Sequence, residues 1–414
     1  MRQFLIFLIL CVLSFDISAQ EIPSNNDNLE LLDPIDSSDS LILYDSLNII
    51  GEILEGYINE EFYYKGLETT IQLYDISSRL YGLEDTTTLF FEELFFGIAN
   101  YLIKESENEY TLGNDSIYID INTHIVHSYL RMYGDNHLFY VISLNNLAAS
   151  YSKIGNYQRS LELYLECLDL FERLSGKESD NYAISLTYIA LSYYKLGNNQ
   201  KSLEYHLESL ELKKKLFGNE DPTSSLNLLY ISNCYANLGD YQKSFDYSLM
   251  SLVILEKTVG KEHPDYMSSL NNVAVSYSDL GDYQRALELH LECLALCEKI
   301  LGKEHPRYAL SLNNVAASYS DLGNYQRALE LNLECLALCE NILDKEHPSY
   351  ALSLSNVAYN YSNLGNYQRA LELHLECLAL KEKTVGKEHP SYALSLSNVA
   401  VSYAGLGYYT RALE

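Results

Sequence analysis

The segment HPRYALSLNNVAASYSDLGNYQRALELNLECLALCENILDKE runs from His305 to Glu346, and the 42 residues that follow nearly repeat it. Two other markers keep the same interval of 42 residues. They are the His-Pro pairs that begin at His263, His305, His347 and His389, and the glycines Gly155, Gly197, Gly239, Gly281, Gly323, Gly365 and Gly407. A fixed period in the range of about 20 to 50 residues is typical of a solenoid, whose units bury their apolar faces only against neighbouring units. The sequence therefore predicts an extended repeat array.

Each unit is predicted to contain two helices separated by a glycine. Apolar residues recur at helical spacing from Tyr308 to Leu322, and a second helix is expected from about Tyr325 to Leu343. Gly323 lies where a left-handed residue ends the first helix, and Asn324 is predicted to cap the second. Pro306 suits the first turn of a helix, so the histidine before each such proline is interpreted as an N-cap.

The run LNNVAASYSDLGNYQRALEL, residues 312–331, resembles a tetratricopeptide repeat, specifically the 42-residue variety of kinesin light chains. The matching residues are Leu312, Ala316, Tyr319, Leu322, Gly323, Tyr325, Ala328 and Cys335. The resemblance implies an all-α, right-handed superhelical solenoid of antiparallel helix pairs. It also implies an inner face that is lined by the first helix of each pair and holds ligand peptides. Small residues are expected where the two helices of a pair approach closely.

Upstream of the regular repeats, the chain is predicted to begin with a signal peptide over residues 1–19. The apolar run from Phe4 to Phe15 has about 12 residues, whereas a membrane span needs about 18 or more. Cleavage after Ala19 would export the protein to the periplasm or the exterior; an uncleaved membrane anchor is the alternative. With cleavage, no segment stays inserted in a membrane. Residues 20–40 are interpreted as an acidic flexible linker.

The remaining residues divide into irregular and regular repeats. Residues 41–136 are interpreted as two degenerate helical repeats that form an N-terminal cap, with an inserted loop around Glu105 to Asp115. Residues 137–414 form seven 42-residue units, of which the last is incomplete. Because this unit stops about six residues into its second helix, too few for a stable helix, we expect the natural protein to continue beyond Glu414.

The composition favours some classes of partner over others. The chain has 57 Asp and Glu against 28 Lys and Arg, a formal net charge of −29. Binding to nucleic acid or to an anionic membrane relies on Lys and Arg, so neither is predicted as a partner. The charge favours a neutral or basic protein or peptide; alternatively, it only keeps the array soluble.

Seven cysteines remain after removal of the signal peptide, and four of them occupy one column of the repeat. These four are Cys167, Cys293, Cys335 and Cys377. Equivalent positions on successive units should lie about 10 Å apart, beyond the roughly 7 Å between Cα atoms that a disulfide allows. The cysteines are therefore predicted to be thiols of the core.

Catalytic motifs are missing from the sequence. It has no Gly-rich phosphate loop, no Gly-x-Ser-x-Gly elbow, no His-Glu-x-x-His helix and no Cys₂His₂ spacing. We therefore predict no enzymatic activity, no cofactor and no metal.

A row of asparagines is the candidate binding site. The resemblance to tetratricopeptide repeats places them along the inner groove: Asn146, Asn272, Asn314, Asn356 and Asn398, with Asn145, Asn271 and Asn313 beside them. An Asn side chain offers donors and an acceptor, so such a row could pair with the backbone of an extended peptide. Alternatively, these side chains bridge neighbouring helices. Tyr188 and Tyr230 interrupt the row.

These observations lead to one favoured function and two alternatives. The chain is interpreted as a non-catalytic scaffold that binds a protein or peptide on the inner face of its superhelix. It could instead be the sensory or docking region of a larger exported signalling enzyme, such as a histidine kinase or a caspase-like peptidase. The third possibility is a surface spacer with a variable number of repeats.

Overall fold

The computed structural model describes residues 114–342, 348–384, 386–387 and 390–414, together with scattered positions between 68 and 107. All regular elements in this part of the chain are helices. The chain divides into two units, Met1–Lys177 and Glu178–Glu414. The predicted signal peptide, the linker and most of the degenerate repeats lie outside the described residues.

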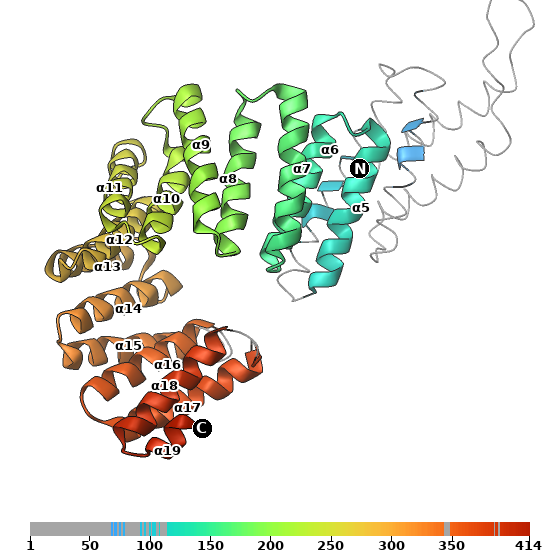
Figure 1. Cartoon of the computed structure of the whole chain (residues 1–414). Helices are drawn as coiled ribbons and strands as arrows, with labels where there is room; N and C mark the ends of the chain where they lie inside the picture. The colour runs from blue at the N-terminus through green and yellow to red at the C-terminus, as the bar shows by residue number, and fades with distance from the viewer. Residues whose placement is uncertain are drawn as a thin grey trace, which may run out of the picture. The chain divides into compact units, whose positions relative to one another are not determined.

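The first unit contains α5 (Asp115–Tyr133), α6 (Leu138–Lys153) and α7 (Tyr157–Ser175), which lie side by side (Figure 1). Aromatic side chains fill the space beside α5. The rings of Phe95 and Tyr129 meet edge to face at 5.0 Å, and Tyr133 stacks on His137 at 4.5 Å. The Tyr133 hydroxyl donates to Glu92 Oε1 at 2.7 Å. Burial, followed by this carboxylate, raises the pKa of Tyr133 above its ordinary value, so the hydroxyl remains a donor.

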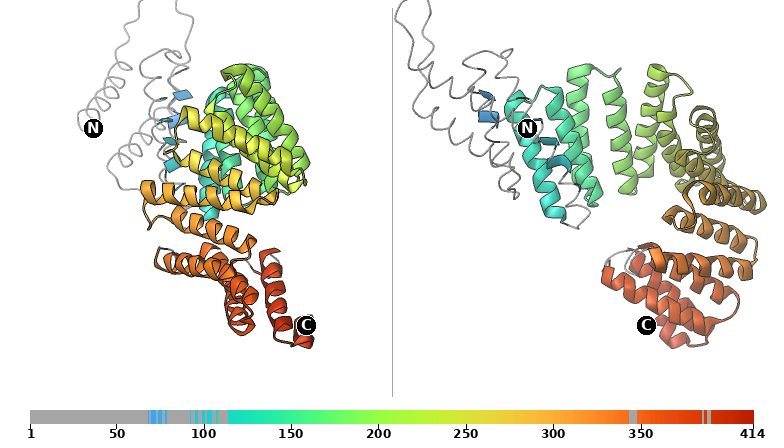
Figure 2. Two further views of the ribbon diagram at one scale, coloured as in Figure 1. Left: turned by 90° about the vertical axis from the view of Figure 1, so that its left-hand side faces the viewer. Right: turned by 180° about the vertical axis from the view of Figure 1, so that it is seen from behind.

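The second unit is a succession of helix pairs (Figures 1 and 2). The pairs are α8 (Asp180–Lys195) and α9 (Asn199–Phe217), α10 (Ser225–Asn237) and α11 (Tyr241–Thr258), α12 (Pro264–Asp279) and α13 (Tyr283–Leu301), α14 (Pro306–Asp321) and α15 (Tyr325–Ile342), α16 (Pro348–Asn363) and α17 (Tyr367–Thr384), and α18 (Pro390–Gly405) and α19 (Tyr409–Leu413). Short connections make the two helices of a pair antiparallel. The predicted all-α solenoid of antiparallel helix pairs is therefore confirmed.

The helix boundaries follow from the capping residues. Gly323 has a φ of 75°, the left-handed conformation that ends α14. The next residue, Asn324, accepts a hydrogen bond at 3.2 Å from the backbone N–H of Arg327. His305 accepts one at 3.1 Å from the N–H of Arg307, with Pro306 in the first turn. These predicted caps are confirmed for this repeat, whereas His347 and His389 lie outside the described residues.

The core of each repeat lies between its two helices and the next pair. Ala316 of α14 and Ala328 of α15 are both fully buried, as expected where two helices approach closely. The seven cysteines after residue 114 are all buried free thiols, which confirms the prediction. Burial raises the pKa of Cys335 to about 11, so this thiol stays protonated and unreactive at neutral pH.

Two leucines differ from the predicted apolar stripes. Leu333 belongs to the apolar residues of the second helix, but it is 40% exposed. Leu310 of the first helix is also exposed. Both residues lie on the sides of their helices that face away from the core, where apolar periodicity alone does not distinguish them from core residues.

One junction departs from the repeat. A short 3₁₀ helix, η1 (Pro222–Ser224), precedes α10, and its start is capped by the Asp221 carboxylate, which accepts from the Thr223 N–H at 3.1 Å. The buried Lys213 ammonium donates to the Thr223 carbonyl at 3.1 Å. Burial lowers the pKa of Lys213. The equivalent positions in other repeats hold Phe171, Leu255, Cys297, Cys339 and Lys381, so lysine replaces an apolar or thiol side chain in two of the repeats.

Candidate functional site

The pairing of helices gives the second unit two distinct exposed surfaces. We define the A face as the exposed sides of the first helices α12, α14, α16 and α18. The B face consists of the exposed sides of the second helices α11, α13, α15 and α17. The two sets of helices alternate along the unit (Figure 2). All predicted asparagines from Asn271 onward belong to first helices.

The asparagines on these helices link one repeat to the next. The Asn314 Nδ2 donates to Asn271 Oδ1 at 2.7 Å, and Asn356 Nδ2 donates to Asn313 Oδ1 at 2.5 Å. Asn398 makes a similar bond to the hydroxyl of Ser355 at 3.4 Å. These three asparagines therefore bridge neighbouring repeats, because each bonds its own helix to the preceding first helix.

Bridging leaves part of each amide group unused. The Oδ1 atoms of Asn314 and Asn356 make no further hydrogen bond among the described residues, and both side chains are only half-buried. Asn272 forms no bridge, because the position 43 residues earlier holds Leu229, which cannot accept a hydrogen bond. A ligand could therefore still reach an oriented acceptor on α14 and α16 and a free amide on α12.

The other predicted positions do not extend this row. Asn145 and Asn146 lie on α6 in the first unit, where Asn146 is exposed and the Asn145 Oδ1 is buried without a hydrogen-bond partner. In the second unit, Tyr188 on α8 and Tyr230 on α10 take the place of asparagine. Tyr230 stacks on the buried His206 ring at 5.4 Å, so the tyrosine ring packs against the core. The described asparagine row of the second unit runs from α12 to α18.

Apolar side chains flank the asparagine row on the A face. Leu310, Leu352 and Leu394 are 54%, 50% and 64% exposed, and each lies four residues before an asparagine of the row. On the other side, three residues after the asparagines, Val275, Tyr359 and Val401 are also exposed. Sequence reasoning missed these residues as part of the site. The spacing of four residues between each leucine and its asparagine could have identified the leucines, because residues four apart share one side of a helix.

Most charged side chains near the A face are acidic or already form a hydrogen bond. The Asp321 carboxylate accepts from the Ser278 hydroxyl at 2.8 Å. Partial burial raises the pKa of Asp279 above its ordinary value. The Arg307 guanidinium donates to the Pro264 carbonyl at 3.3 Å. The surface can therefore bind by apolar burial and amide hydrogen bonds, and the carboxylates of Asp279 and Asp321 favour cationic over anionic groups.

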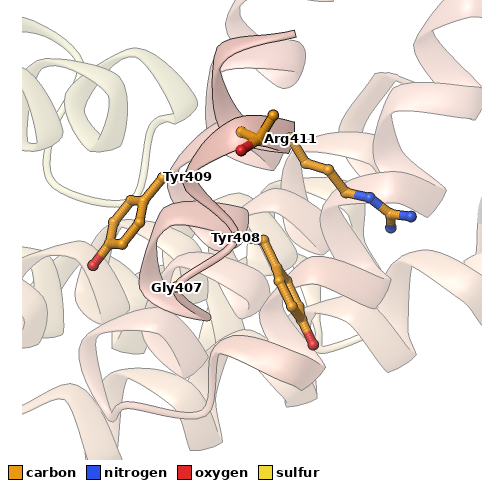
Figure 3. A pocket seen from close by; sticks show the side chains of 5 residues that line it. Gly407, Tyr408, Tyr409 and Arg411 are labelled. Atoms are coloured by element: carbon orange, nitrogen blue, oxygen red, sulfur yellow. The ribbon is translucent and has the colours of Figure 1, made fainter.

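Other kinds of site were sought in the described part of the chain. No three His, Cys, Asp or Glu side chains there are arranged to hold a metal ion. No helix within the described ranges is long and apolar enough to cross a membrane. A hollow at α19 is lined by Gly407, Tyr408, Tyr409, Thr410 and Arg411. Its labelled side chains point in different directions and converge on no common point, so they do not form a polar site (Figure 3).

Comparisons with known proteins agree with this architecture. The family model of the tetratricopeptide repeat matches residues 131–215, 224–299, 265–341, 307–383 and 349–414, together more than half of the chain. No curated protein matches the chain. A kinesin light chain protein of Podosopora anserina with nearly identical TPR-like repeats is 28% identical, and the match covers 49% of this chain and 95% of that one, with a TM-score of 0.43.

Two Rap structures cover more of the chain. RapI in its apo form is 14% identical over 84% of this chain and 93% of that one, with a TM-score of 0.53. A Rap protein complexed with competence and sporulation factor has the same identity and coverage and a TM-score of 0.51. These likenesses show a shared fold. The repeated helix pairs and the match over most of the repeat region establish that the chain belongs to the tetratricopeptide repeat family.

Proposed function

We propose that the A face of α12 to α18 binds an extended segment of another protein, and that the chain acts as a non-catalytic binding scaffold. The observation that carries the proposal is the row of exposed leucines beside hydrogen-bonded asparagines on consecutive first helices. Exposed apolar side chains in a contiguous arrangement mark interaction surfaces. A Rap protein that shares the fold was solved with a bound factor, so the fold is compatible with this role.

The proposed partner is neutral or basic, since the chain carries a formal net charge of −29. We further propose that the predicted signal peptide directs the chain to the periplasm or the exterior, where this partner would be met. The alternative of a sensory or docking region in a larger enzyme remains a prediction, because no feature of the described residues bears on it.

A peptide array tests the proposal directly. The full chain is applied to an array of random 15-residue peptides, and hits are measured again in solution. We expect a set of saturable hits whose binding weakens when Leu310 and Leu352 are both changed to Ser. Serine is tolerated at this position, since Ser268 occupies it in α12.

The matched control changes Leu333 and Leu375, which are similarly exposed on the B face. The Leu333→Ser/Leu375→Ser variant should bind the hits as the natural chain does. Hits that bind the A-face variant with unchanged affinity would contradict the proposal. The same conclusion would follow if the B-face variant lost binding and the A-face variant did not.

A further inference from the structure

The repeat formed by η1, α10 and α11 has a more polar core than the repeat that follows it. Four of its buried core positions hold serine: Ser232, Ser244, Ser248 and Ser251. The same positions of the next repeat hold methyl, imidazole or thiol side chains: Ala274, Ala286, His290 and Cys293. Burial of apolar surface is the main stabilising term in folding, and a hydroxyl group adds none. The repeat from η1 to α11 therefore gains less stability from its core than its neighbour does.

The contact between α11 and α12 at one of these serines is weaker than its equivalent in the next repeat. The Ser248 hydroxyl oxygen lies 3.2 Å from that of Ser276. Each of these hydroxyls also donates to a carbonyl of its own helix, at 2.9 Å and 3.0 Å. Because a hydroxyl has one proton, the two serines can bond only when one of them gives up its intrahelical bond. In the next repeat, the His290 ring nitrogen lies 2.7 Å from the Ser318 hydroxyl oxygen.

The bridge between consecutive first helices is also missing at this junction. Asn314 of α14 bonds to Asn271 of α12, whereas Asn272 of α12 lies opposite Leu229 of α10, which cannot accept a hydrogen bond. An ion pair between Lys299 and Glu262 does cross the junction at 2.6 Å. Both of its side chains are mostly exposed, so it contributes little to stability.

The buried apolar side chains of this region form two separate clusters that meet at α11. One cluster contains Leu203, Leu210, Leu228, Ile231, Cys234 and Ile254. The other begins at Leu255 and continues to Cys377 of α17. Leu255, together with the edge-to-face contact of Phe245 with Tyr277 at 4.7 Å, holds α11 against α12 in the closed state. Opening of α10 and α11 would therefore leave most of the larger cluster intact.

We infer that the repeat from η1 to α11 is a joint, which opens locally while α12 to α17 remain folded. In a repeat array, stability is approximately the sum of the stability of each repeat and of the interfaces between neighbours. A repeat that is weaker in its core and at its interface opens first. Such opening frees α8 and α9 to change their orientation relative to the A face. The inference is independent of the proposed binding function.

Hydrogen exchange followed by mass spectrometry tests the inference on the full natural chain. After correction for intrinsic rates, the backbone amides of α10 and α11 should exchange at least about tenfold faster than those of α12 and α13, because exchange of a hydrogen-bonded amide requires local opening. Equal exchange in the two pairs of helices would overturn the inference.

Variants that transfer core residues between the two repeats assign the effect to the serines. The first variant carries Ser232→Ala, Ser244→Ala, Ser248→His and Ser251→Cys. Its imidazole at position 248 is placed to reach Ser276 as His290 reaches Ser318, and exchange in α10 and α11 should slow to the rate of α12 and α13. The reverse variant carries Ala274→Ser, Ala286→Ser, His290→Ser and Cys293→Ser. Exchange in α12 and α13 should then become at least about tenfold faster.

Circular dichroism verifies that both variants keep their helicity. The inference fails if the first variant is folded and α10 and α11 still exchange as fast as in the natural chain. It also fails if the reverse variant leaves exchange in α12 and α13 unchanged. If the first variant loses helicity, the natural chain and the reverse variant decide the question.

Discussion

The ring Nδ1 of His290 lies 2.7 Å from the hydroxyl oxygen of Ser318, 28 residues further along the chain. His374 makes the same contact with Ser402 at 2.8 Å. His206 occupies the same column of the repeat, but the residue 28 positions later is Cys234. Both ring nitrogens of His206 are buried without a hydrogen-bond partner, and the Cys234 thiol donates instead to Ser202 Oγ at 3.4 Å.

Cys234→Ser should therefore stabilise the array. A buried polar group without a partner costs about 1–3 kcal/mol, and a serine at position 234 can make the hydrogen bond seen at the two equivalent sites. We expect the midpoint of urea denaturation, followed by circular dichroism, to rise. The midpoint is the appropriate quantity because long repeat arrays can unfold in parts.

The reciprocal change supplies the control. Ser318→Cys removes the partner of His290 and should lower the midpoint by a similar amount. If Cys234→Ser lowered the midpoint as much as Ser318→Cys does, the assignment of His206 as an unsatisfied group would be wrong.

The buried histidines should make stability depend on pH. Burial lowers the pKa of His206 to about 3 and that of His290 to about 4, from an ordinary value of 6.5. Between pH 6.5 and these values the unfolded chain binds protons that the folded chain does not, so the free energy of unfolding falls as the pH falls. From pH 7 to pH 5 each histidine should remove about 2 kcal/mol of stability.

Thermal denaturation at the two pH values measures this effect. Asn332 occupies the same column, so the His206→Asn/His290→Asn variant is a natural comparison without a titrating group. Its denaturation temperature should differ less between pH 7 and pH 5 than that of the natural chain. An identical pH dependence in both proteins would show that other groups are responsible.

Asn314 and Asn272 should respond differently to substitution. Asn314→Ala removes the bridge to Asn271 and should lower stability by about 0.5–1.5 kcal/mol. Asn272 forms no bridge, so Asn272→Ala should change stability by less than about 0.5 kcal/mol. Both variants should weaken the binding of a ligand that contacts the row. Equal losses of stability on urea denaturation would contradict the difference in their roles.

The sequence predicted the repeat architecture well because its strongest signals are local. Gly323, Asn324 and Pro306 act within one turn of backbone, and Ala316 and Ala328 mark the close approach of two helices in one repeat. Each signal recurs at the same interval, so the fold class and the helix boundaries could be derived without any long-range information.

The candidate site was harder to derive because it depends on distances between repeats. The sequence placed Asn313 and Asn356 in neighbouring rows, but it could not show that they bond to each other across 43 residues. Leu310 has the same chemistry as the buried Leu312, and only the direction of each side chain separates them. The burial of Lys213 is still less predictable, because a single lysine in a helix is normally exposed.

The two leucines provide a test of this orientation. Leu312 is 1% exposed, so Leu312→Ala should lower stability by about 2–5 kcal/mol. Leu310→Ala removes a side chain that is mostly in solvent and should change stability by less than about 0.5 kcal/mol. Urea denaturation of both variants measures the difference, and comparable losses would place Leu310 in the core instead of on the A face.

The most direct test of the binding surface is site-specific photo-crosslinking. A benzophenone side chain replaces Tyr359 on the A face in one protein and Leu333 on the B face in another; both positions are exposed. Each protein is irradiated with a peptide selected on the random array, and the adducts are quantified by mass spectrometry. We expect the peptide to be captured at position 359 and not at position 333. Capture at position 333 with an equal or greater yield would contradict it.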